Sequence, residues 1–193
     1  ISGSNAKNAV FFLHGYGADG ADLFDLHKPF SMVMPNAEFI SPDAPHDCAM
    51  SPIGKEWFPI EKIPFGAAEA SKDLLMFLET ECKSLSISLE QIVLIGFSQG
   101  AMMSLQTLLI SPKKFRAIIA FSGRLSVENI NLSEFNIENG KHKNHETPIL
   151  LVHGEKDEVV HFDSLKITKD LLTNIGFNVK KLSRPDLGHG IDP

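Results

Sequence analysis

The chain has 193 residues, of which 43% are hydrophobic, and its formal net charge is −6. This length suits one well-formed core rather than two domains, and its scattered basic residues exclude a nucleic-acid-binding stripe or a polybasic membrane patch. No apolar run approaches the roughly 18 residues that cross a bilayer, so we expect no integral membrane segment.

Short apolar runs alternate with amphipathic stretches along the chain. The runs that stop at glycine or proline predict buried strands, and stretches with apolar residues at helical spacing predict helices. In chain order, we expect a strand at 9–13, a strand at 38–41, a helix at 67–83, a strand at 92–95, a helix at 99–110, a strand at 116–121, a strand at 148–152, a helix at 161–174 and a weaker, alternating strand near an edge at 178–182.

This order predicts an α/β fold, with a mostly parallel central sheet and helices on both faces. In such sheets, ligands bind outside the carboxyl ends of the strands. The segments that follow five of the predicted strands are HGYGADG, GFSQG, SGR, HGEKDE and SRPDLGHG. They would bring a serine, several acids and several histidines to one edge of the sheet.

The GFSQG segment carries the strongest signal. It places Ser98 between Gly96 and Gly100, after an apolar strand and before a helix, which is the pattern of a nucleophile elbow. A tight strand-to-helix turn strains its central residue, and glycines two positions away avoid collisions there. The alternative interpretation is an ordinary strand-to-helix turn with a helix-capping serine.

A serine nucleophile needs a base, and the base needs an orienting acid. In this fold the order along the chain is serine, acid, histidine, and Asp157 follows a strand later than Ser98. The competing acids are Glu155 and Glu158 in the same loop, with Asp163 and Asp186 less favoured.

His189 is the predicted base, because it lies in a glycine-flanked loop beyond the last strand. Two other histidines compete with it. His153 precedes the predicted acid and so stands in the wrong order, and His161 is expected to begin a helix.

An oxyanion would need two further donors. One is the backbone N–H of the residue after the nucleophile, Gln99. The other is expected from the HGYG segment after the first strand, with the backbone N–H of Tyr16 as the candidate. His14, in the same segment, is interpreted as a structural hydrogen-bonding residue rather than a second base.

A proline-rich stretch at 42–66 is the candidate wall of a substrate site. It holds Trp57, the only tryptophan, together with Phe58 and Met50, and a long loop in a compact domain is often functional. These three side chains either bind an acyl chain or anchor the loop to the core. The segment 122–147 is too short for a cap domain of the usual size, so we expect no separate cap domain.

Cys48 and Cys82 form neither a metal-binding spacing nor a disulfide framework. Free cysteines are typical of a reducing compartment, so we expect a cytoplasmic protein. No cluster of ligating residues predicts a bound metal.

Five segments together resemble the phospholipase/carboxylesterase family of α/β-hydrolases, which includes bacterial carboxylesterases and acyl-protein thioesterases. They are FFLHGYGADGADLFDL, SPDAPHDCAMSPIGKEWFPI, IGFSQGAM, ILLVHGEKDEVV and GHGID.

The resemblance implies a serine hydrolase that cleaves carboxylic esters or thioesters without a cofactor. It assigns nucleophile, acid and base to Ser98, Asp157 and His189, and the oxyanion donors to Tyr16 and Gln99. The implied substrate is a small acyl ester or thioester, with lysophospholipids and acylated proteins as candidates. The sequence leaves the choice between a monomer and a homodimer open.

The chain departs from the family pattern in three places. Pro59 stands where the tryptophan segment of the family commonly reads W-[FY]-D, a polar stretch at 134–146 is longer than usual, and the sequence stops at Pro193. We therefore expect a single domain over 1–193 that lacks the terminal helix of family members. Two other classes stay open: a serine peptidase or amidase on the same triad, and a non-catalytic binding module.

Overall fold

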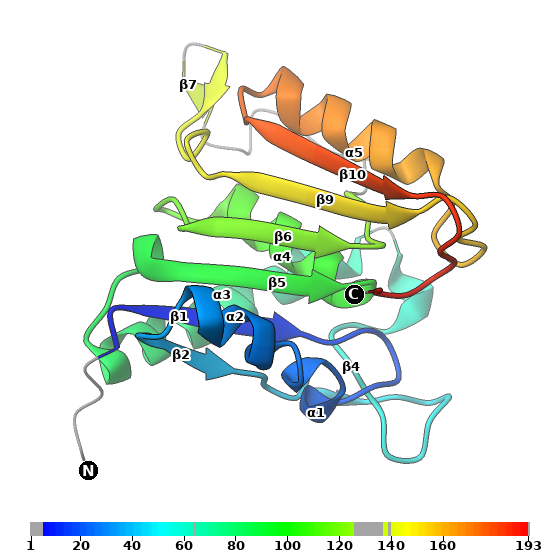
Figure 1. The fold of residues 1–193 in the computed structure, drawn as a ribbon, viewed down its shortest axis with the longest axis horizontal. Coiled ribbons are helices and arrows are strands. Elements are labelled where there is room, and N and C mark those ends of the chain that lie inside the picture. Colours follow the sequence, from blue (N-terminus) through cyan, green and yellow to red (C-terminus); the bar gives the residue numbers. More distant parts are fainter. Residues whose placement is uncertain (1–5, 64, 126–136, 139, 193) are drawn as a thin grey trace.

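The computed structural model describes residues 6–63, 65–125, 137–138 and 140–192. Its centre is a six-stranded sheet in the order β10-β9-β6-β5-β1-β2, in which every neighbouring pair is parallel (Figure 1). The strands are β1 (Asn8–Leu13), β2 (Ala37–Ile40), β5 (Ile92–Phe97), β6 (Ala117–Phe121), β9 (Ile149–Gly154) and β10 (Val179–Arg184).

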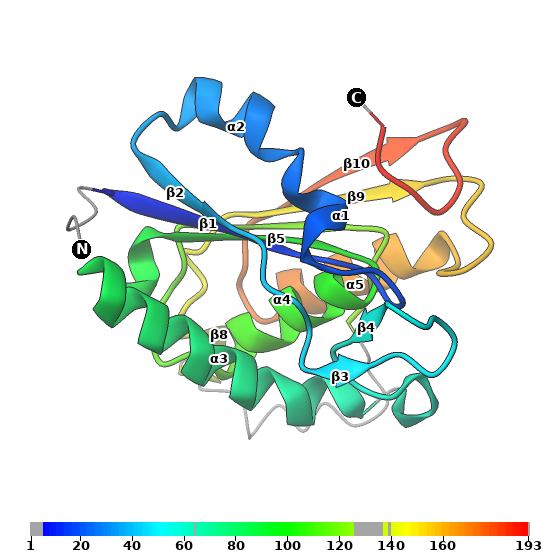
Figure 2. The ribbon, with the colours of Figure 1, turned by 90° about the horizontal axis from the view of Figure 1, so that it is seen from below.

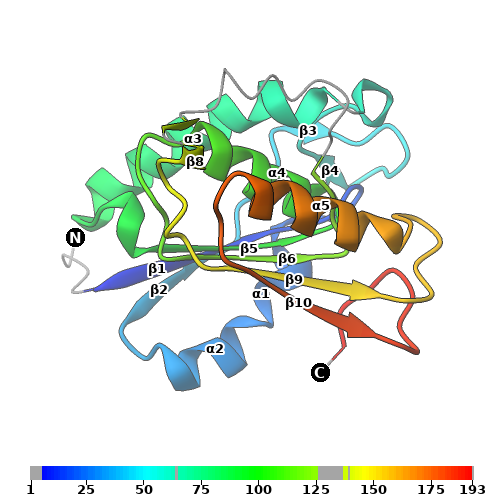
Figure 3. The ribbon, with the colours of Figure 1, turned by 90° about the horizontal axis from the view of Figure 1, so that it is seen from above.

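Helices cover both faces of this sheet, as the views along its plane show (Figures 2 and 3). One face carries the three long helices α3 (Gly66–Leu85), α4 (Gln99–Ile110) and α5 (Asp163–Asn174). The other face carries the short helices α1 (Gly20–Phe24) and α2 (His27–Val33) over β1 and β2. The sequence prediction of an α/β fold with helices on both faces is therefore confirmed.

Short elements complete the described chain. They are the antiparallel pairs β3 (His46–Asp47) with β4 (Lys55–Glu56) and β7 (Ile137–Glu138) with β8 (Lys141–His142), and the 3₁₀ turns Ile60–Lys62 and Leu89–Gln91.

Side-chain alternation in the central strands divides the core between the two faces. On β1, Phe11 and Leu13 join the larger cluster on the side of α3, α4 and α5, whereas Val10 and Phe12 join the smaller cluster on the opposite face. Burial on both faces explains why these strands read as continuous apolar runs. The centre of the fold is consequently well packed beneath the loops at the sheet edge.

Every predicted strand and long helix is present, with bounds shifted by a few residues, and β10 does lie at an edge of the sheet. The sequence did not predict α1 and α2, because these helices are short and α2 has no buried residue that would produce an apolar stripe. His161 lies in the turn before α5 rather than inside the helix. Within the segment where no cap domain was expected, residues 126–136 and 139 lie outside the described residues. Among the helices that are described, none is long and apolar enough to cross a membrane.

Candidate active site

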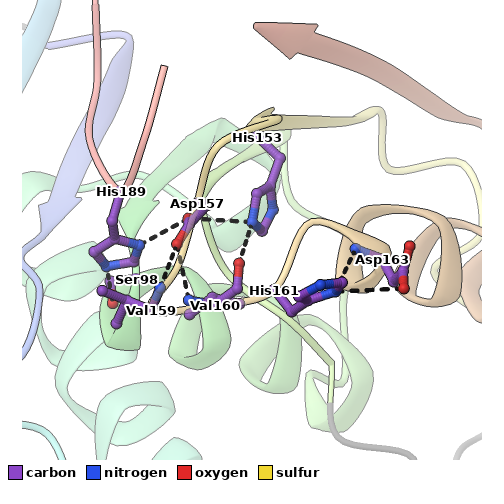
Figure 4. Close-up of polar contacts among 8 residues, drawn as sticks. All are labelled: Ser98, His153, Asp157, Val159, Val160, His161, Asp163 and His189. Atoms are coloured by element: carbon purple, nitrogen blue, oxygen red, sulfur yellow. Dashed lines mark hydrogen bonds and ion pairs between the residues drawn. The ribbon is translucent and has the colours of Figure 1, made fainter. Parts of the chain in front are cut away.

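The loops that follow β1, β5, β9 and β10 all leave the sheet at its carboxyl edge (Figure 1). Three polar side chains from these loops form a hydrogen-bonded row: Ser98 after β5, His189 after β10 and Asp157 after β9 (Figure 4). The parallel order of the strands is what brings together residues so far apart in the sequence.

Ser98 stands on a sharp turn between β5 and α4, with φ 52° and ψ −114°. A side chain at Gly96 would place its Cβ 2.3 Å from the Gly100 carbonyl oxygen, and one at Gly100 would place its Cβ 2.0 Å from the Leu13 carbonyl oxygen. Both positions therefore require glycine. The Ser98 side chain makes no capping hydrogen bond to α4, which argues against the alternative interpretation of a helix-capping serine.

His189 connects the other two residues of the row. Its Nε2 lies 2.9 Å from Ser98 Oγ, and its Nδ1 lies 2.8 Å from Asp157 Oδ2. A carboxylate only accepts hydrogen bonds, so Nδ1 carries the proton and Nε2 is free to accept the serine proton. The imidazole also packs on Phe97, with ring centroids 4.9 Å apart.

The loop of His189 is held by contacts rather than by glycine conformations. Arg184 Nε donates to Asp192 Oδ2 at 2.8 Å, which closes the loop. Neither Gly188 nor Gly190 has a positive φ, and a Cβ at either position would meet nothing closer than 3.6 Å. The backbone geometry at the two glycines that flank His189 therefore does not require glycine there.

Asp157 is buried, with a 4% exposed fraction. Its Oδ1 accepts from the backbone N–H groups of Val159 and Val160, both at 2.9 Å. Burial raises the pKa of Asp157, but the hydrogen bonds from His189, Val160 and Val159 together outweigh it and hold the pKa below its ordinary value. This carboxyl group is consequently an anion at neutral pH.

Within the described residues, none of the competing side chains makes a hydrogen bond to Ser98. Glu155 and Glu158 are exposed. His161 pairs with Asp163 at 3.3 Å at the start of α5, and Asp186 pairs with Lys156. His153 is buried behind Asp157, on the side away from Ser98 (Figure 4).

Two backbone N–H groups border the cavity at Ser98. Among the residues that the structure describes, neither the N–H of Tyr16 nor that of Gln99 has a protein acceptor, so both could bind an oxyanion. A hydrogen bond with the thiol of Cys48 raises the pKa of the Tyr16 phenol to about 12.

The Gln99 side chain has a structural role. Its Oε1 accepts from the Trp57 backbone N–H at 2.8 Å, and its Nε2 donates to the Phe58 carbonyl at 2.7 Å. These bonds hold the 57–58 segment against the start of α4. His14 is also structural, since its Nε2 accepts from the Ala44 N–H, and burial lowers its pKa.

A cavity of about 430 Å³ opens directly at Ser98 and His189. The rest of its lining combines apolar and polar side chains: Ile60, Ile63, Met102, Val159 and Val160, and Tyr16, Gln99, Arg124, His161 and Ser164. Volume and lining suit a small-molecule site with an apolar part.

The three side chains predicted to bind substrate lie outside this lining. Trp57 and Phe58 line a different cavity of about 320 Å³ beside α3, and the Trp57 indole donates to the buried His14 carbonyl at 2.9 Å. Met50 is 82% exposed. Their role in substrate binding stays a prediction, and the contacts of Trp57 fit the alternative that it anchors the loop.

Sequence reasoning missed most of the cavity lining. Ile60 and Ile63 belong to the predicted wall at 42–66 but were not singled out, and Arg124 lies just after β6, in the SGR segment. The signal that could have found Arg124 was its place at the carboxyl end of a strand. No group of three or more His, Cys, Asp or Glu within the described residues could hold a metal ion.

Comparisons with known proteins identify the family of the chain. The chain is 33% identical over 204 residues to acyl-protein thioesterase 1 of Candida albicans, covering 94% of this chain and 84% of that protein. It is 28% identical over 192 residues to esterase YpfH of Escherichia coli, covering 97% of this chain and 78% of that protein. The crystal structure of esterase PE8 superposes with a TM-score of 0.88 at 34% identity, covering 98% of this chain and 88% of that one. Residues 2–193 match the sequence model of Phospholipase/Carboxylesterase, and the chain belongs to this family.

Proposed function

We propose that this protein is a serine hydrolase that cleaves carboxylic esters or thioesters through an acyl-enzyme on Ser98. The observation that carries the proposal is the position of His189, whose two ring nitrogens lie within hydrogen-bonding distance of Ser98 and of the buried Asp157. Membership of the family supports it, and relatives are named as carboxylesterases and acyl-protein thioesterases.

The geometry accounts for each step of such a reaction. His189 Nε2 takes the Ser98 proton as Oγ attacks the carbonyl carbon, and Asp157 stabilises the imidazolium that forms. The developing oxyanion binds the N–H groups of Tyr16 and Gln99, next to the positive end of the α4 dipole. Collapse expels the alcohol or thiol, which receives the proton from His189. Water then attacks the acyl-enzyme by the same steps in reverse, releasing the acid and free Ser98.

The cavity at Ser98 indicates how the acyl group is held. Ile60, Ile63 and Met102 offer apolar contacts next to the nucleophile, and we place the acyl chain against them. The substrates that fit are small acyl esters or thioesters, and lysophospholipids and acylated proteins are candidates for the natural ones. The free, buried Cys48 and Cys82 fit a reducing, cytoplasmic location.

A fluorophosphonate probe tests the proposal, because it reacts covalently with an activated serine. We expect labelling of the wild-type protein and none of Ser98→Ala. Ser164→Ala is the matched control, since Ser164 lines the same cavity, and the hydrogen bonds of the His189 ring in the described structure go to Ser98 and Asp157. Labelling of Ser98→Ala at the wild-type rate would refute the assignment of the nucleophile.

Substrate panels separate the remaining classes. Matched nitrophenyl esters, thioesters and anilides of one acyl group should show ester or thioester cleavage far above amide cleavage. Preferential cleavage of the amide would instead indicate a peptidase or amidase, and absence of labelling and of turnover would indicate a binding module.

A further inference from the structure

A second histidine contacts the carboxylate of Asp157 from the side opposite His189 (Figure 4). His153, the residue before the last of β9, has its Nε2 3.2 Å from Asp157 Oδ2 and 2.7 Å from the Val160 carbonyl oxygen. Its side chain is 1% exposed and that of Asp157 is fully buried. This contact is therefore shielded from water.

The chemistry of the two neighbours assigns the proton on His153. A backbone carbonyl and an ionised carboxylate can only accept hydrogen bonds, so Nε2 of His153 must carry a hydrogen and donate. The shorter bond goes to Val160, whose own N–H donates to Asp157 Oδ1 at 2.9 Å. Through the N–H and the carbonyl of Val160, His153 is therefore linked to the carboxylate of Asp157, and these bonds hold the turn at 157–160.

The carboxylate of Asp157 is thereby surrounded. Three hydrogen bonds reach the carboxylate: the N–H groups of Val159 and Val160 donate to Oδ1, and His189 Nδ1 donates to Oδ2. The N–H of His153 donates to the Val160 carbonyl, and its Nε2 lies 3.2 Å from Oδ2. These contacts together limit rotation of the carboxylate. It holds Nδ1 of His189 in one direction, which keeps Nε2 aimed at Ser98.

We propose that His153 is a positioning residue of the reaction, which acts through Asp157 by fixing its orientation and by sharing the negative charge on Oδ2. This inference rests on the proposed function, because it takes Asp157 and His189 as the acid and base of a serine hydrolase.

Other charged groups near this row are engaged elsewhere or exposed. Ion pairs join Lys156 to Asp186, Arg184 to Asp192 and His161 to Asp163; Glu155 and Glu158 are exposed, and Arg124, beyond β6, lines the cavity at Ser98. The titratable side chains that contact Asp157 within the described residues are therefore His153, which is buried, and His189, which is half-buried. A substitution at His153 acts on that row directly.

Removing the donor has two expected consequences. Asp157 gains freedom to rotate, which lowers kcat more than it raises KM. More negative charge is left facing His189, which favours the protonated imidazole. The acid limb of the pH profile, which is the fall of kcat/KM at low pH, therefore moves to higher pH. A histidine that only filled the core would alter stability without moving this limb.

The experiment compares His153→Leu with His153→Gln by kcat/KM against pH on a short-chain nitrophenyl ester, with thermal unfolding as the check of folding. We expect His153→Leu to lose about 10- to 100-fold in kcat, because it leaves the buried Val160 carbonyl without its donor and the Asp157 carboxylate less firmly held. The acid limb should rise by about half a pH unit or more. Glutamine keeps an N–H near the Nε2 position, so His153→Gln should recover most of the rate and the original limb. If His153→Leu does not fold, His153→Asn replaces it, because its shorter amide lies at the Nδ1 end of the imidazole position.

A double-mutant cycle with Asp157→Asn completes the test. If His153 acts through the carboxylate, His153→Leu should lower the rate of Asp157→Asn by less than about threefold, well below its effect in the wild type. If the losses in rate from His153→Leu and Asp157→Asn simply multiply, the proposal is overturned. An unchanged rate and acid limb in His153→Leu would also overturn it. So would equal losses in the leucine and glutamine variants with no shift of the limb. The wild type in the same assay separates the two hypotheses: an inactive wild type refutes the proposed function, whereas an active wild type with an unaffected His153→Leu refutes this inference alone.

Discussion

Gly100→Ala is the sharpest perturbation of the elbow. Gly100 is the second residue of α4, and helix propensity alone would favour alanine there by about 1 kcal/mol. The structure predicts the opposite. A Cβ at this position lies 2.0 Å from the Leu13 carbonyl oxygen, 2.5 Å from the Leu13 carbonyl carbon and 2.7 Å from the His14 carbonyl oxygen.

All three of these atoms belong to the backbone, so no side chain can move aside. The end of β1 and the start of α4 must separate by about 1.4 Å, the difference between 2.0 Å and an ordinary contact of 3.4 Å. Those two segments carry the N–H groups of Tyr16 and Gln99 and also carry Ser98. A displacement of about 1 Å at reacting groups lowers rates by about 100-fold, and overpacking destabilises by about 1–3 kcal/mol. The steric effect should therefore exceed the gain in propensity.

The assay is kcat/KM on a short-chain nitrophenyl ester, together with thermal unfolding. We expect Gly100→Ala to lose at least about 100-fold in kcat/KM and to unfold at a lower temperature. Gly188→Ala is the matched control beside His189, where a Cβ would meet only the Lys156 carbonyl at 3.6 Å, and it should stay within about threefold of the wild type. A Gly100→Ala protein with the wild-type rate and stability would refute the steric account of the elbow.

Three further predictions follow from the site. Asp157→Asn should lower kcat by about 10⁴-fold. The folded-state pKa of Asp157 lies below its ordinary value, so the carboxylate stabilises the fold above the unfolded pKa of about 3.9 and this stabilisation is lost as pH falls through the folded pKa. The difference in unfolding temperature between wild type and variant should therefore shrink in acid, and a constant difference would contradict this prediction. Trp57→Phe leaves the buried His14 carbonyl without its indole donor, so it should destabilise by about 1–3 kcal/mol in chemical denaturation with an unchanged acyl-length profile; a changed profile would restore Trp57 to substrate binding. Arg124 is a half-buried cation in the cavity at Ser98, so Arg124→Gln should slow hydrolysis of an ester with a free carboxylate more than that of its neutral methyl analogue, and equal effects on both would contradict a role in substrate binding.

The elements and the nucleophile could be predicted from the sequence because their signals are local. Continuous apolar runs such as residues 92–95 must be buried on both sides, and alternation of strands with helices leaves a parallel sheet as the way to bury them. The collision at Gly96 is with Gly100 and Ala101, within a few residues of Ser98, so this part of the glycine spacing is readable before the fold is known. The collision at Gly100 is with the end of β1, and only the fold shows it. The helices α1 and α2 gave no comparable signal, because α2 buries none of its residues.

The partners of Ser98 could be ranked from the sequence, but only the tertiary structure determines which side chains touch. Glu155 and Glu158 share the loop of the predicted acid and compete with it in sequence, and the fold buries Asp157 while leaving the two glutamates exposed. The same holds for Trp57, which lies in the predicted wall yet faces a different cavity from Ser98. His153 was set aside as a base because of its order along the chain, and its contact with Asp157 emerged only from the fold. Side-chain direction and burial depend on packing between distant segments, and a single sequence does not encode these contacts as a local pattern.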